Sequence, residues 1–273
     1  MLQVKTESFV LDKFPGYNDE GKITLFTKKF GILNVVASGL YRPGARLMAW
    51  TEPASLVTAD LTLPEEALPS GRLLTLSPQK IFLTIRKSYV SASWYYFYLF
   101  MLANFLPHGI KSVFIYNLWE ELLDSPTFEN SRNRTLGFIY FATKLLKNQG
   151  FYPSFKFCIH CNKSWEAGET AYCYLPEQGL ICRDCLRKNL SRLRYDNYSY
   201  SLDFLNLLPL KNKINLPEGV LRVRPAEREI LEVAEKSPHL SDFFANIFSR
   251  SSINDSSLKK VRNFLLIFLA PLL

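Results

Sequence analysis

Four of the five cysteines fall into two Cys-x-x-Cys pairs, the spacing of a metal centre. The first pair is Cys158 with Cys161, the second is Cys182 with Cys185, and twenty residues separate the two pairs. A two-residue gap lets both sulfurs of a pair reach one ion, and the long segment between the pairs can fold back to bring the second pair opposite the first. Four thiolates complete a tetrahedral shell and leave no position for water. We therefore predict a structural zinc ion and not a catalytic one.

His160 and Cys173 are two further residues near the pairs that can bind metals. His160 lies inside the first pair and could replace a cysteine, but four thiolates already fill the shell. Cys173 is predicted to be a small core residue. The alternative to a metal site is a set of buried or redox-active thiols. A redox-active Cys-x-x-Cys usually lies next to a βαβ pattern, which this sequence lacks.

The composition is that of a globular protein, with 48% hydrophobic and 21% charged residues. At 273 residues the chain is long enough for one large domain or two modest ones. The formal net charge of +8 favours anionic partners such as nucleic acid or a membrane surface. The odd cysteine argues against a secreted disulfide scaffold, the N-terminus lacks a signal-peptide pattern, and the apolar stretch at 264–273 is too short to span a bilayer. We therefore expect a cytoplasmic protein with no membrane segment.

The first part of the chain, residues 1–80, has the pattern of a β-barrel. Apolar and polar residues alternate in short runs that are separated by Gly and Pro turns. The predicted strands cover residues 8–14, 22–29, 32–39, 48–62 with an interruption at Pro53, and 71–76. Closing five such strands into a ring removes the exposed strand edges, so we predict an OB-type barrel.

From about residue 81 the apolar residues recur at three and four positions, the period of a helix. The predicted helices cover residues 88–106, 111–123, 132–148, 185–193, 201–208, 226–236, 239–248 and 257–272. The cysteine pairs interrupt this series as a zinc-binding insert at about residues 155–190. The predicted fold is therefore an α+β multidomain protein. An OB-type barrel at 1–80 precedes an all-helical domain at 81–273, which carries the insert.

Two groups of basic residues are candidates for contact with a phosphate backbone. The first lies on turns and at the exit of the barrel, where the loops of an OB-type barrel frame its nucleic-acid-binding face. The second follows the second cysteine pair, with members four apart on one helix face. The first group is Lys28, Lys29, Arg42, Arg46 and Lys80, and the second is Arg183, Arg187, Lys188, Arg192 and Arg194.

Each of these candidates has a plainer interpretation as well. A basic residue can be a solvated surface charge, and the second group can partly balance the formal charge of about −2 that four thiolates leave on one zinc ion. Binding of a single strand also needs aromatic side chains for base stacking. The aromatic residues near barrel turns, each of which can instead belong to the core, are Tyr17, Phe30, Tyr41 and Trp50.

The sequence offers little for catalysis. It has no Gly-rich phosphate-binding motif, no His-x-Glu beside the cysteines and no Gly-x-Ser-x-Gly. Adjacent carboxylates such as Glu120 and Glu121 point apart on a helix. The chain has only three histidines, so it offers few candidates for a histidine-based active site. We therefore predict that the protein is not an enzyme.

A set of short segments in the N-terminal half carries a family resemblance. In order, they are Phe9–Leu11, Gly16–Glu20, Leu25–Thr27, Gly31, Val36–Gly39, and a basic loop with Arg42-Pro43 and Arg46-Leu47. This order, followed by a helical domain with a four-cysteine insert, resembles the RecO family of bacterial DNA repair proteins. The chain departs from the family pattern in two ways, because the turn at 16–20 is one residue longer and Ala45 stands where many members have Ser. Some members lack the cysteines, so the resemblance does not make zinc a requirement of the family's activity.

The resemblance implies a recombination mediator that binds single- and double-stranded DNA. It implies that the protein assists recombinase loading together with RecR, promotes annealing of complementary single strands, and docks the tail of single-stranded-DNA-binding protein on its helical domain. Such a protein is expected to be associated with the bacterial nucleoid. The alternative function is a zinc-containing nucleic-acid-modifying enzyme with a barrel for substrate binding. A third possibility is a scaffold with no role in nucleic-acid binding.

Overall fold

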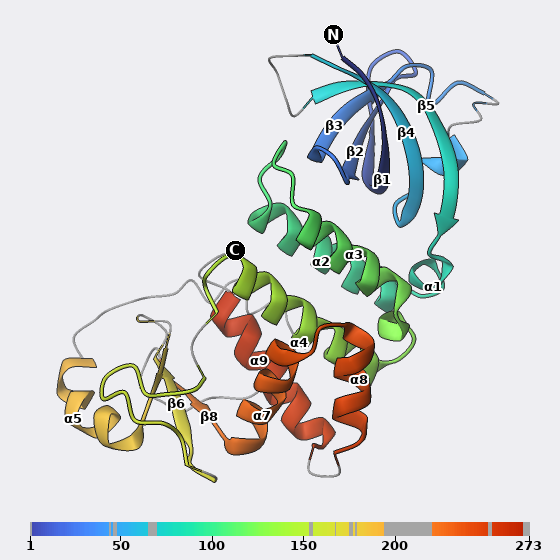
Figure 1. Ribbon diagram of the computed structural model, residues 1–273. Coiled ribbons are helices and arrows are strands. Elements are labelled where there is room, and N and C mark those ends of the chain that lie inside the picture. The colour runs from blue at the N-terminus through green and yellow to red at the C-terminus, as the bar shows by residue number, and fades with distance from the viewer. Residues whose placement is uncertain are drawn as a thin grey trace. The chain divides into compact units, whose positions relative to one another are not determined.

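The structure is a computed structural model that describes residues 2–43, 45, 48–64, 70–152, 155–166, 168–174, 177, 179–193, 220–250 and 253–269. Two compact units divide the chain, Met1–Glu129 and Asn130–Leu273. Each unit buries its own set of apolar side chains. The first unit contains a barrel and the helices that follow it. The second contains the other helices and the cysteine pairs (Figure 1).

The first unit begins with five strands, β1 (Leu2–Pro15), β2 (Gly21–Thr27), β3 (Gly31–Ala37), β4 (Ser55–Leu63) and β5 (Ser70–Ile81). They close into a barrel in the order β1-β2-β3-β5-β4, because β4 pairs with β1 as well as with β5. Neighbouring strands are antiparallel except β3 and β5, which share a short parallel pairing. The ring has the five strands of an OB-type barrel, and the predicted α+β fold class is confirmed.

The alternation of side chains explains why these residues form a barrel. On β2, Ile23 and Leu25 belong to the buried core, and Lys22 and Thr24 alternate with them on the outer face. The same alternation holds on β3, where the core receives every second side chain. A period of two over both strands of a hairpin fixes which face is buried and therefore fixes the register.

The strand predicted at 48–62 begins later than expected. Met48–Trp50 forms a short 3-10 helix, η1, and β4 starts only at Ser55. The Oγ1 of Thr51 donates to the carbonyl of Met48 at 3.0 Å, and Ala54 has a positive φ of 61°. Both features turn the backbone away from an extended path before β4. The prediction of a strand over residues 48–52 is therefore wrong.

Helices α1 (Leu83–Arg86), α2 (Tyr89–Phe105), α3 (Val113–Asp124) and η2 (Pro126–Phe128) complete the first unit. The hydroxyls of Ser88 and Ser112 cap α2 and α3 by accepting hydrogen bonds from backbone N–H groups three residues later. The ring of Tyr116 on α3 lies against Phe9 and Phe26 of the barrel, with centroid separations of 5.1 and 5.3 Å. The compact unit thus extends beyond the last barrel strand, and the domain boundary expected at residue 80 remains a prediction.

Tyr95 joins α2 to the barrel through its buried hydroxyl. This hydroxyl accepts a hydrogen bond from the backbone N–H of Ala54 at 3.0 Å and donates one to the carbonyl of Val10 at 3.2 Å. Burial raises the pKa of Tyr95 well above its usual range, so the hydroxyl stays protonated. We expect Tyr95→Phe to lower the free energy of unfolding by about 1 kcal/mol, because two buried backbone groups each lose one hydrogen bond but keep the one between them, from the N–H of Ala54 to the carbonyl of Val10 at 3.2 Å. Urea unfolding of the full chain measures this, and an unchanged free energy would contradict it.

The second unit is built on four helices, α4 (Ser131–Asn148), α7 (Pro225–Lys236), α8 (Leu240–Phe248) and α9 (Asp255–Leu269). Helix α4 contacts the other three, and most of its side chains between Asn133 and Leu146 are buried. The helices predicted in these regions are confirmed, whereas the one predicted at 201–208 lies outside the described residues. Among the described helices, none combines the length and the apolar character that crossing a bilayer requires.

A small sheet and α5 (Arg183–Leu193) form the cysteine-rich part of the second unit. Strand β6 (Ala171–Tyr174) lies between β7 (Gly179–Ile181) and β8 (Val220–Val223). Strand β8 lies beyond the limit predicted for the insert and leads almost directly into α7. The sequence did not predict this pairing, which joins the insert to the helical core through backbone hydrogen bonds.

Candidate metal centre and nucleic-acid surfaces

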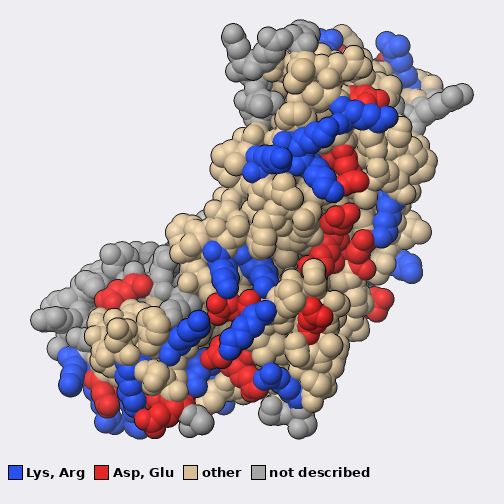
Figure 2. Space-filling view, viewed as in Figure 1, with Lys and Arg blue, Asp and Glu red and all other residues tan. Residues whose placement is uncertain are grey.

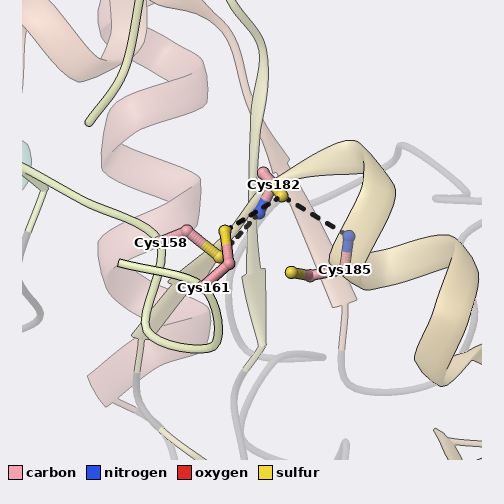
Figure 3. Close-up of side chains that lie close together, drawn as sticks. All are labelled: Cys158, Cys161, Cys182 and Cys185. Carbon is pink, nitrogen blue, oxygen red and sulfur yellow. Dashed lines mark hydrogen bonds between the residues drawn. The ribbon is translucent and has the colours of Figure 1, made fainter. Parts of the chain in front are cut away.

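The first cysteine pair lies on a tight turn. The N–H of Cys158 donates to the carbonyl of Lys163 at 2.9 Å, and the N–H of Asn162 donates to the carbonyl of Cys158 at 2.8 Å. Asn162 has a left-handed φ of 59°, a conformation that asparagine tolerates better than most residues. This closed turn brings the sulfurs of Cys158 and Cys161 together (Figure 3).

The second pair spans the end of β7 and the first turn of α5. The N–H of Leu186 donates to the carbonyl of Cys182 at 2.9 Å, and the N–H of Cys185 donates to the Cys182 sulfur at 3.4 Å. The N–H of Ile159, in the first turn, donates to the carbonyl of Leu180 on β7 at 2.9 Å. The two turns are therefore hydrogen-bonded to each other. The start of α5 also favours negative charge on the sulfurs beside it.

The four sulfurs form one compact cluster (Figure 3). All four Sγ atoms lie within 4.8 Å of one another, and those of Cys161 and Cys182 are 3.8 Å apart. Sulfurs at ~2.3 Å from a tetrahedral ion are about 3.8 Å apart, so the donor set fits such an ion. The structure thus brings together the four predicted ligands, Cys158, Cys161, Cys182 and Cys185, and together they could hold a metal ion.

The thiols of the cluster differ in how readily they ionise. Burial opposes ionisation of Cys158, but the backbone N–H groups of Cys161, Cys182 and His160 outweigh it and lower the pKa of the Cys158 thiol to about 7. Burial raises the pKa of Cys182, and burial together with hydrogen bonds to the neighbouring thiols raises that of Cys185. Thiols packed this closely cannot all ionise unless a positive charge compensates them.

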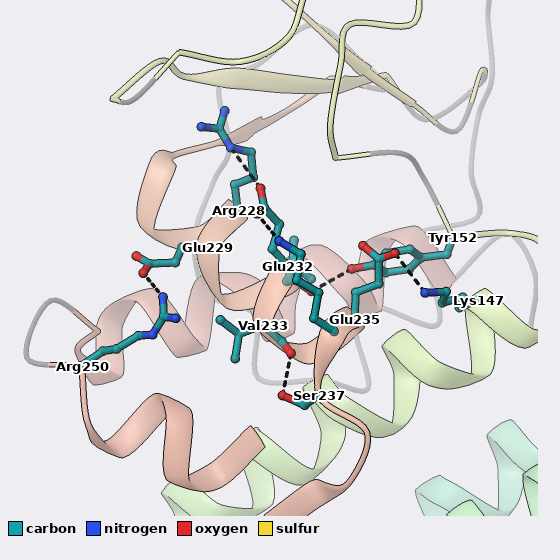
Figure 4. Close-up of polar contacts among 11 residues, drawn as sticks. Lys147, Tyr152, Arg228, Glu229, Glu232, Val233, Glu235, Ser237 and Arg250 are labelled. Carbon is teal, nitrogen blue, oxygen red and sulfur yellow. Dashed lines mark hydrogen bonds and ion pairs between the residues drawn. The ribbon is translucent and has the colours of Figure 1, made fainter. Parts of the chain in front are cut away.

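Arg228 on α7 anchors the loop that follows the first turn. Its guanidinium lies over the ring of Trp165 at 5.6 Å and donates to the carbonyls of Glu166 and Glu169 at 3.4 and 3.3 Å. Arg228 also forms an ion pair with Glu232 at 3.8 Å and is one of several polar residues on α7 that contact neighbouring segments (Figure 4). Sequence reasoning missed Arg228, because its partners are distant in sequence and no local pattern identifies it.

The two other metal-binding residue types near the pairs do not join the cluster. The Nε2 of His160 lies 3.4 Å from a carboxylate oxygen of Glu177. Cys173 lies on β6 and is fully buried, and burial raises the pKa of its thiol to about 12. Cys173 is therefore a core residue, as predicted.

Helix α5 presents an exposed basic surface next to the cysteines. Arg183, Arg187 and Lys188 are exposed, and none of the three forms an ion pair with another residue in the described ranges. Arg183 and Arg187 are four apart and so share one side of the helix. Asp184 on the same helix is exposed too, and Figure 2 shows basic and acidic side chains interspersed over the visible face of the helical unit. The side chain of Arg192 and all of Arg194 lie outside the described part of the chain.

The barrel cations Lys28 and Lys29 are engaged within the barrel unit. The ammonium of Lys28 lies 3.3 Å from the carboxylate of Glu7 and 5.4 Å from the ring centroid of Tyr116. The ammonium of Lys29 donates to the carbonyl of Lys5 at 3.1 Å. A shallow hollow of about 190 Å³ is bordered by Lys5, Glu7, Lys28 and Lys29. Contact of Lys28 and Lys29 with DNA remains a prediction.

The remaining barrel candidates lie on different parts of the same unit. Arg42 is largely exposed, with its Nε 4.0 Å from a carboxylate oxygen of Asp19. Lys80 forms an ion pair with Asp124 and lies over the ring of Phe82 at 5.1 Å. Arg46 lies outside the described residues. The structure therefore does not gather the predicted barrel cations into one patch.

The comparisons with known proteins agree with one another. A family model described as "Recombination protein O C terminal" matches residues 90–232. A protein of Alkaliphilus metalliredigens named DNA repair protein RecO is 25% identical over 237 residues, which cover 81% of this chain and 91% of the relative. A protein of the same name from Syntrophomonas wolfei is 21% identical over 186 residues, which cover 67% of this chain and 70% of that relative. The matched segment 90–232 contains all of α2 but its first residue, together with α3, α4 and the cysteine cluster.

Proposed function

The chain belongs to the RecO family of DNA repair and recombination proteins, and from this membership we propose that it is a recombination mediator. In this role it binds single- and double-stranded DNA, assists recombinase loading together with RecR on strands coated by single-stranded-DNA-binding protein, and promotes annealing of complementary strands. It acts without catalysing a reaction. Working on chromosomal strands, it would be associated with the nucleoid. The family match over residues 90–232 is the observation that carries this proposal.

The physical requirement for a mediator is to hold phosphate chains without reading the bases. The exposed cations of α5 suit that task, because they are not committed to carboxylates among the described residues. A barrel of OB type supplies the second element, a surface that tracks a single strand. We accordingly retain Arg183, Arg187 and Lys188 as proposed contacts with DNA. They lie on α5, the helix that begins within the second cysteine pair.

The metal in this proposal is zinc, and its role is structural. A set of four thiolates is typical of structural zinc sites, which have no open coordination position. The bound ion would supply positive charge and hold the two turns together, and Cys158, Cys161, Cys182 and Cys185 would be its ligands. The alternative function, a zinc-containing nucleic-acid-modifying enzyme, requires a position open to water, which a four-cysteine shell does not provide.

The helical unit offers a place for the tail of single-stranded-DNA-binding protein. A hollow of about 320 Å³ there combines lysine and aromatic side chains. Its aromatic lining residues are Tyr152, Phe155 and Phe157, and its charged ones are Lys147, Lys156 and Glu235, of which Lys147 and Glu235 form an ion pair at 3.0 Å. A tail that is both acidic and hydrophobic would place its apolar side chains on the rings and its carboxylates near the two lysines, in competition with Glu235 for Lys147. We propose this hollow as the docking site of the tail.

Salt dependence tests the proposed function. We expect the full chain to bind a labelled single-stranded oligonucleotide, with the logarithm of the association constant falling linearly as the logarithm of salt concentration rises. The slope should be about −0.7 for each phosphate neutralised, because each contact releases a condensed counterion. Fluorescence anisotropy at several salt concentrations measures the slope. Affinity that stays constant between low and moderate salt, or no binding at all, would contradict the proposal.

A further inference from the structure

One short segment of the helical unit belongs to two sites at once. Phe155, Lys156 and Phe157 line the hollow of about 320 Å³ on this unit, and the next residue is Cys158, the first predicted ligand of the metal centre. A single peptide bond thus joins the lining of the hollow to the cysteine cluster. We call residues 155–157 the wall segment. A displacement of the first cysteine turn is transmitted to the wall segment, because a peptide unit is planar and stiff.

Backbone pairing fixes the wall segment to the first cysteine turn. Phe157 and Ser164, which flank the turn, form an antiparallel β-bridge, and the N–H of Cys158 donates to the carbonyl of Lys163 at 2.9 Å. The turn closed by this pairing carries Cys158 and Cys161, two of the four sulfurs of the cluster. A metal ion bonded to both sulfurs would hold the turn closed, and it would therefore hold Phe157 in place as well.

The two aromatic residues of the wall segment differ in how they are held. Phe155 is buried, and its ring centroid lies 5.1 Å from that of Tyr152 and 6.3 Å from that of Phe264 on α9. Phe157 is 41% exposed, so packing of its own ring holds it less firmly. The helical core therefore fixes Phe155 through aromatic contacts, whereas Phe157 depends mainly on the β-bridge to the cysteine turn.

The rest of the hollow is tied to two helices that carry no cysteine. The hydroxyl of Tyr152 donates to the carbonyl of Leu231 on α7 at 3.1 Å, and Lys147 of α4 forms an ion pair with Glu235 of α7 at 3.0 Å (Figure 4). Helices α4 and α7 contact each other directly. One side of the hollow is thus set by helix packing, and the side at Phe157 is set by the cysteine turn. The second side can lose its position while the helices stay folded, because parts of a protein can open locally.

We propose that the metal centre regulates the hollow, which takes an acidic, hydrophobic peptide tightly only when a metal ion holds the first cysteine turn closed. The inference rests on the proposed function, in which such a tail docks there. Apolar side chains of the peptide lie on the rings of Phe155 and Phe157, so loss of the metal displaces one of these rings. Binding free energies are coupled reciprocally, and the peptide must therefore tighten metal binding by the same factor as the metal tightens peptide binding. The cysteine cluster is then a regulatory element as well as a structural one.

Peptide binding to the full chain tests this coupling. The probe is a fluorescein-labelled peptide of ~10 residues in which aspartates precede phenylalanines, and binding is followed by anisotropy. A peptide with the same aspartates and with serines in place of the phenylalanines is the control. We expect the zinc-loaded chain to bind the probe about tenfold more tightly than the chain stripped by a chelator, and restored zinc to recover the affinity. In the converse experiment, zinc affinity is measured by competition with a chromophoric chelator, and saturating probe should raise it by the same factor.

The variant Phe157→Ala separates regulation of the hollow from a general effect of zinc on stability. Phe157 is largely exposed and is not a metal ligand, so the variant should keep its zinc. With zinc bound, it should bind the probe about tenfold more weakly than the unmodified chain, and removal of zinc should cause little further loss. Phe248→Ala is the matched control, because Phe248 is 54% exposed in the same unit and does not line the hollow. It should retain both the affinity and its dependence on zinc.

The proposal is wrong if the probe binds equally to the zinc-loaded and the stripped chain, or if saturating probe leaves the zinc affinity unchanged. It is also wrong if Phe157→Ala loses as much affinity on zinc removal as the unmodified chain does. That result would attribute the zinc dependence to unfolding of the whole helical unit, which far-UV circular dichroism of the stripped chain measures. Failure of the zinc-loaded, unmodified chain to bind the probe would instead overturn the docking site on which the inference rests.

Discussion

Replacing Cys158 and Cys182 with serine is expected to abolish metal binding and to unfold the cysteine-rich part of the second unit. Together the two substitutions remove one ligand from each turn, and the remaining two sulfurs cannot complete a tetrahedral shell. The metal content of the purified protein, measured by atomic absorption, should fall from about one zinc ion per chain to none. Limited proteolysis should then cut within the segment from Phe157 to Leu193.

The expected effect is large because this part of the protein has little else to stabilise it. The apolar cluster around the cysteines has few buried members among the described residues, and these are Cys158, Ile181, Cys182 and Leu186. Structural zinc contributes about 10–16 kcal/mol of apparent binding free energy in small zinc-folded peptides, and binding of the metal is coupled to folding. We therefore expect the double variant to lose more than about 4 kcal/mol of stability in the second unit. Contact of α5 with DNA should weaken as a consequence.

The control for this experiment is Cys173→Ala. Cys173 is fully buried but lies outside the sulfur cluster, so the variant should keep its metal and lose only the packing of one sulfur. Two outcomes would contradict a structural zinc site. One is a double variant that still retains a full equivalent of metal. The other is a metal-free double variant that remains folded with unchanged stability, which is the behaviour expected of a catalytic ion.

We expect Gly31→Ala to destabilise the first unit more than the addition of a methyl group at any other described glycine of that unit. Gly31 has a φ of +70°, and a Cβ atom there would lie 2.1 Å from the carbonyl oxygen and 2.6 Å from the carbonyl carbon of Ile110. These are backbone atoms, and the loop that carries them cannot retreat freely, because the N–H of Gly109 donates to the carbonyl of Ile32 at 2.9 Å. We expect the substitution to cost more than about 3 kcal/mol in the free energy of unfolding.

Gly39→Ala is a closely matched control. Gly39 has nearly the same φ, +68°, and lies in the same unit, but its nearest neighbours are side-chain atoms of Arg42 at 3.2 Å and beyond. A flexible side chain can move, so only the conformational penalty of about 1–2 kcal/mol remains. Urea unfolding of the two variants separates the cost of the steric clash from the cost of the left-handed backbone conformation. Equal losses would show that the approach of Ile110 to Gly31 is not tight in solution.

Much of this protein is determined by local properties of the sequence. The spacing within each Cys-x-x-Cys pair fixes a turn that brings two sulfurs together, and all four predicted ligands lie in one cluster. The period of two in residues 1–80 predicted the five barrel strands, and the helical period after residue 81 predicted the longer described helices in the correct order, but neither predicted β6, β7 and β8. Local pattern failed at Met48–Trp50, where a side-chain hydrogen bond from Thr51 and the left-handed Ala54 turn the chain before β4 begins.

The tertiary structure decided which charges are available. Residue type alone does not distinguish Lys28, Lys29 and Lys80 from other surface cations, and from the sequence we predict all three as DNA contacts. In the folded unit, Lys28 forms an ion pair with Glu7 and lies over the ring of Tyr116, and Lys80 forms an ion pair with Asp124. A charge that is already paired gains less from a phosphate, because an existing interaction must be given up.

The tertiary structure also created the sites that no local pattern contains. Strand β8 reaches β6 from beyond a long intervening segment, and Arg228 contacts a loop far earlier in the chain. On the outside of the barrel, the register of four strands makes neighbours of Phe14, Lys22, Val36 and Arg72. Local spacing along the chain fixes turns, helices and faces, because those depend on bonded geometry. Register and barrel closure depend on which strands bury their apolar faces together, so only the closed barrel places these four side chains side by side.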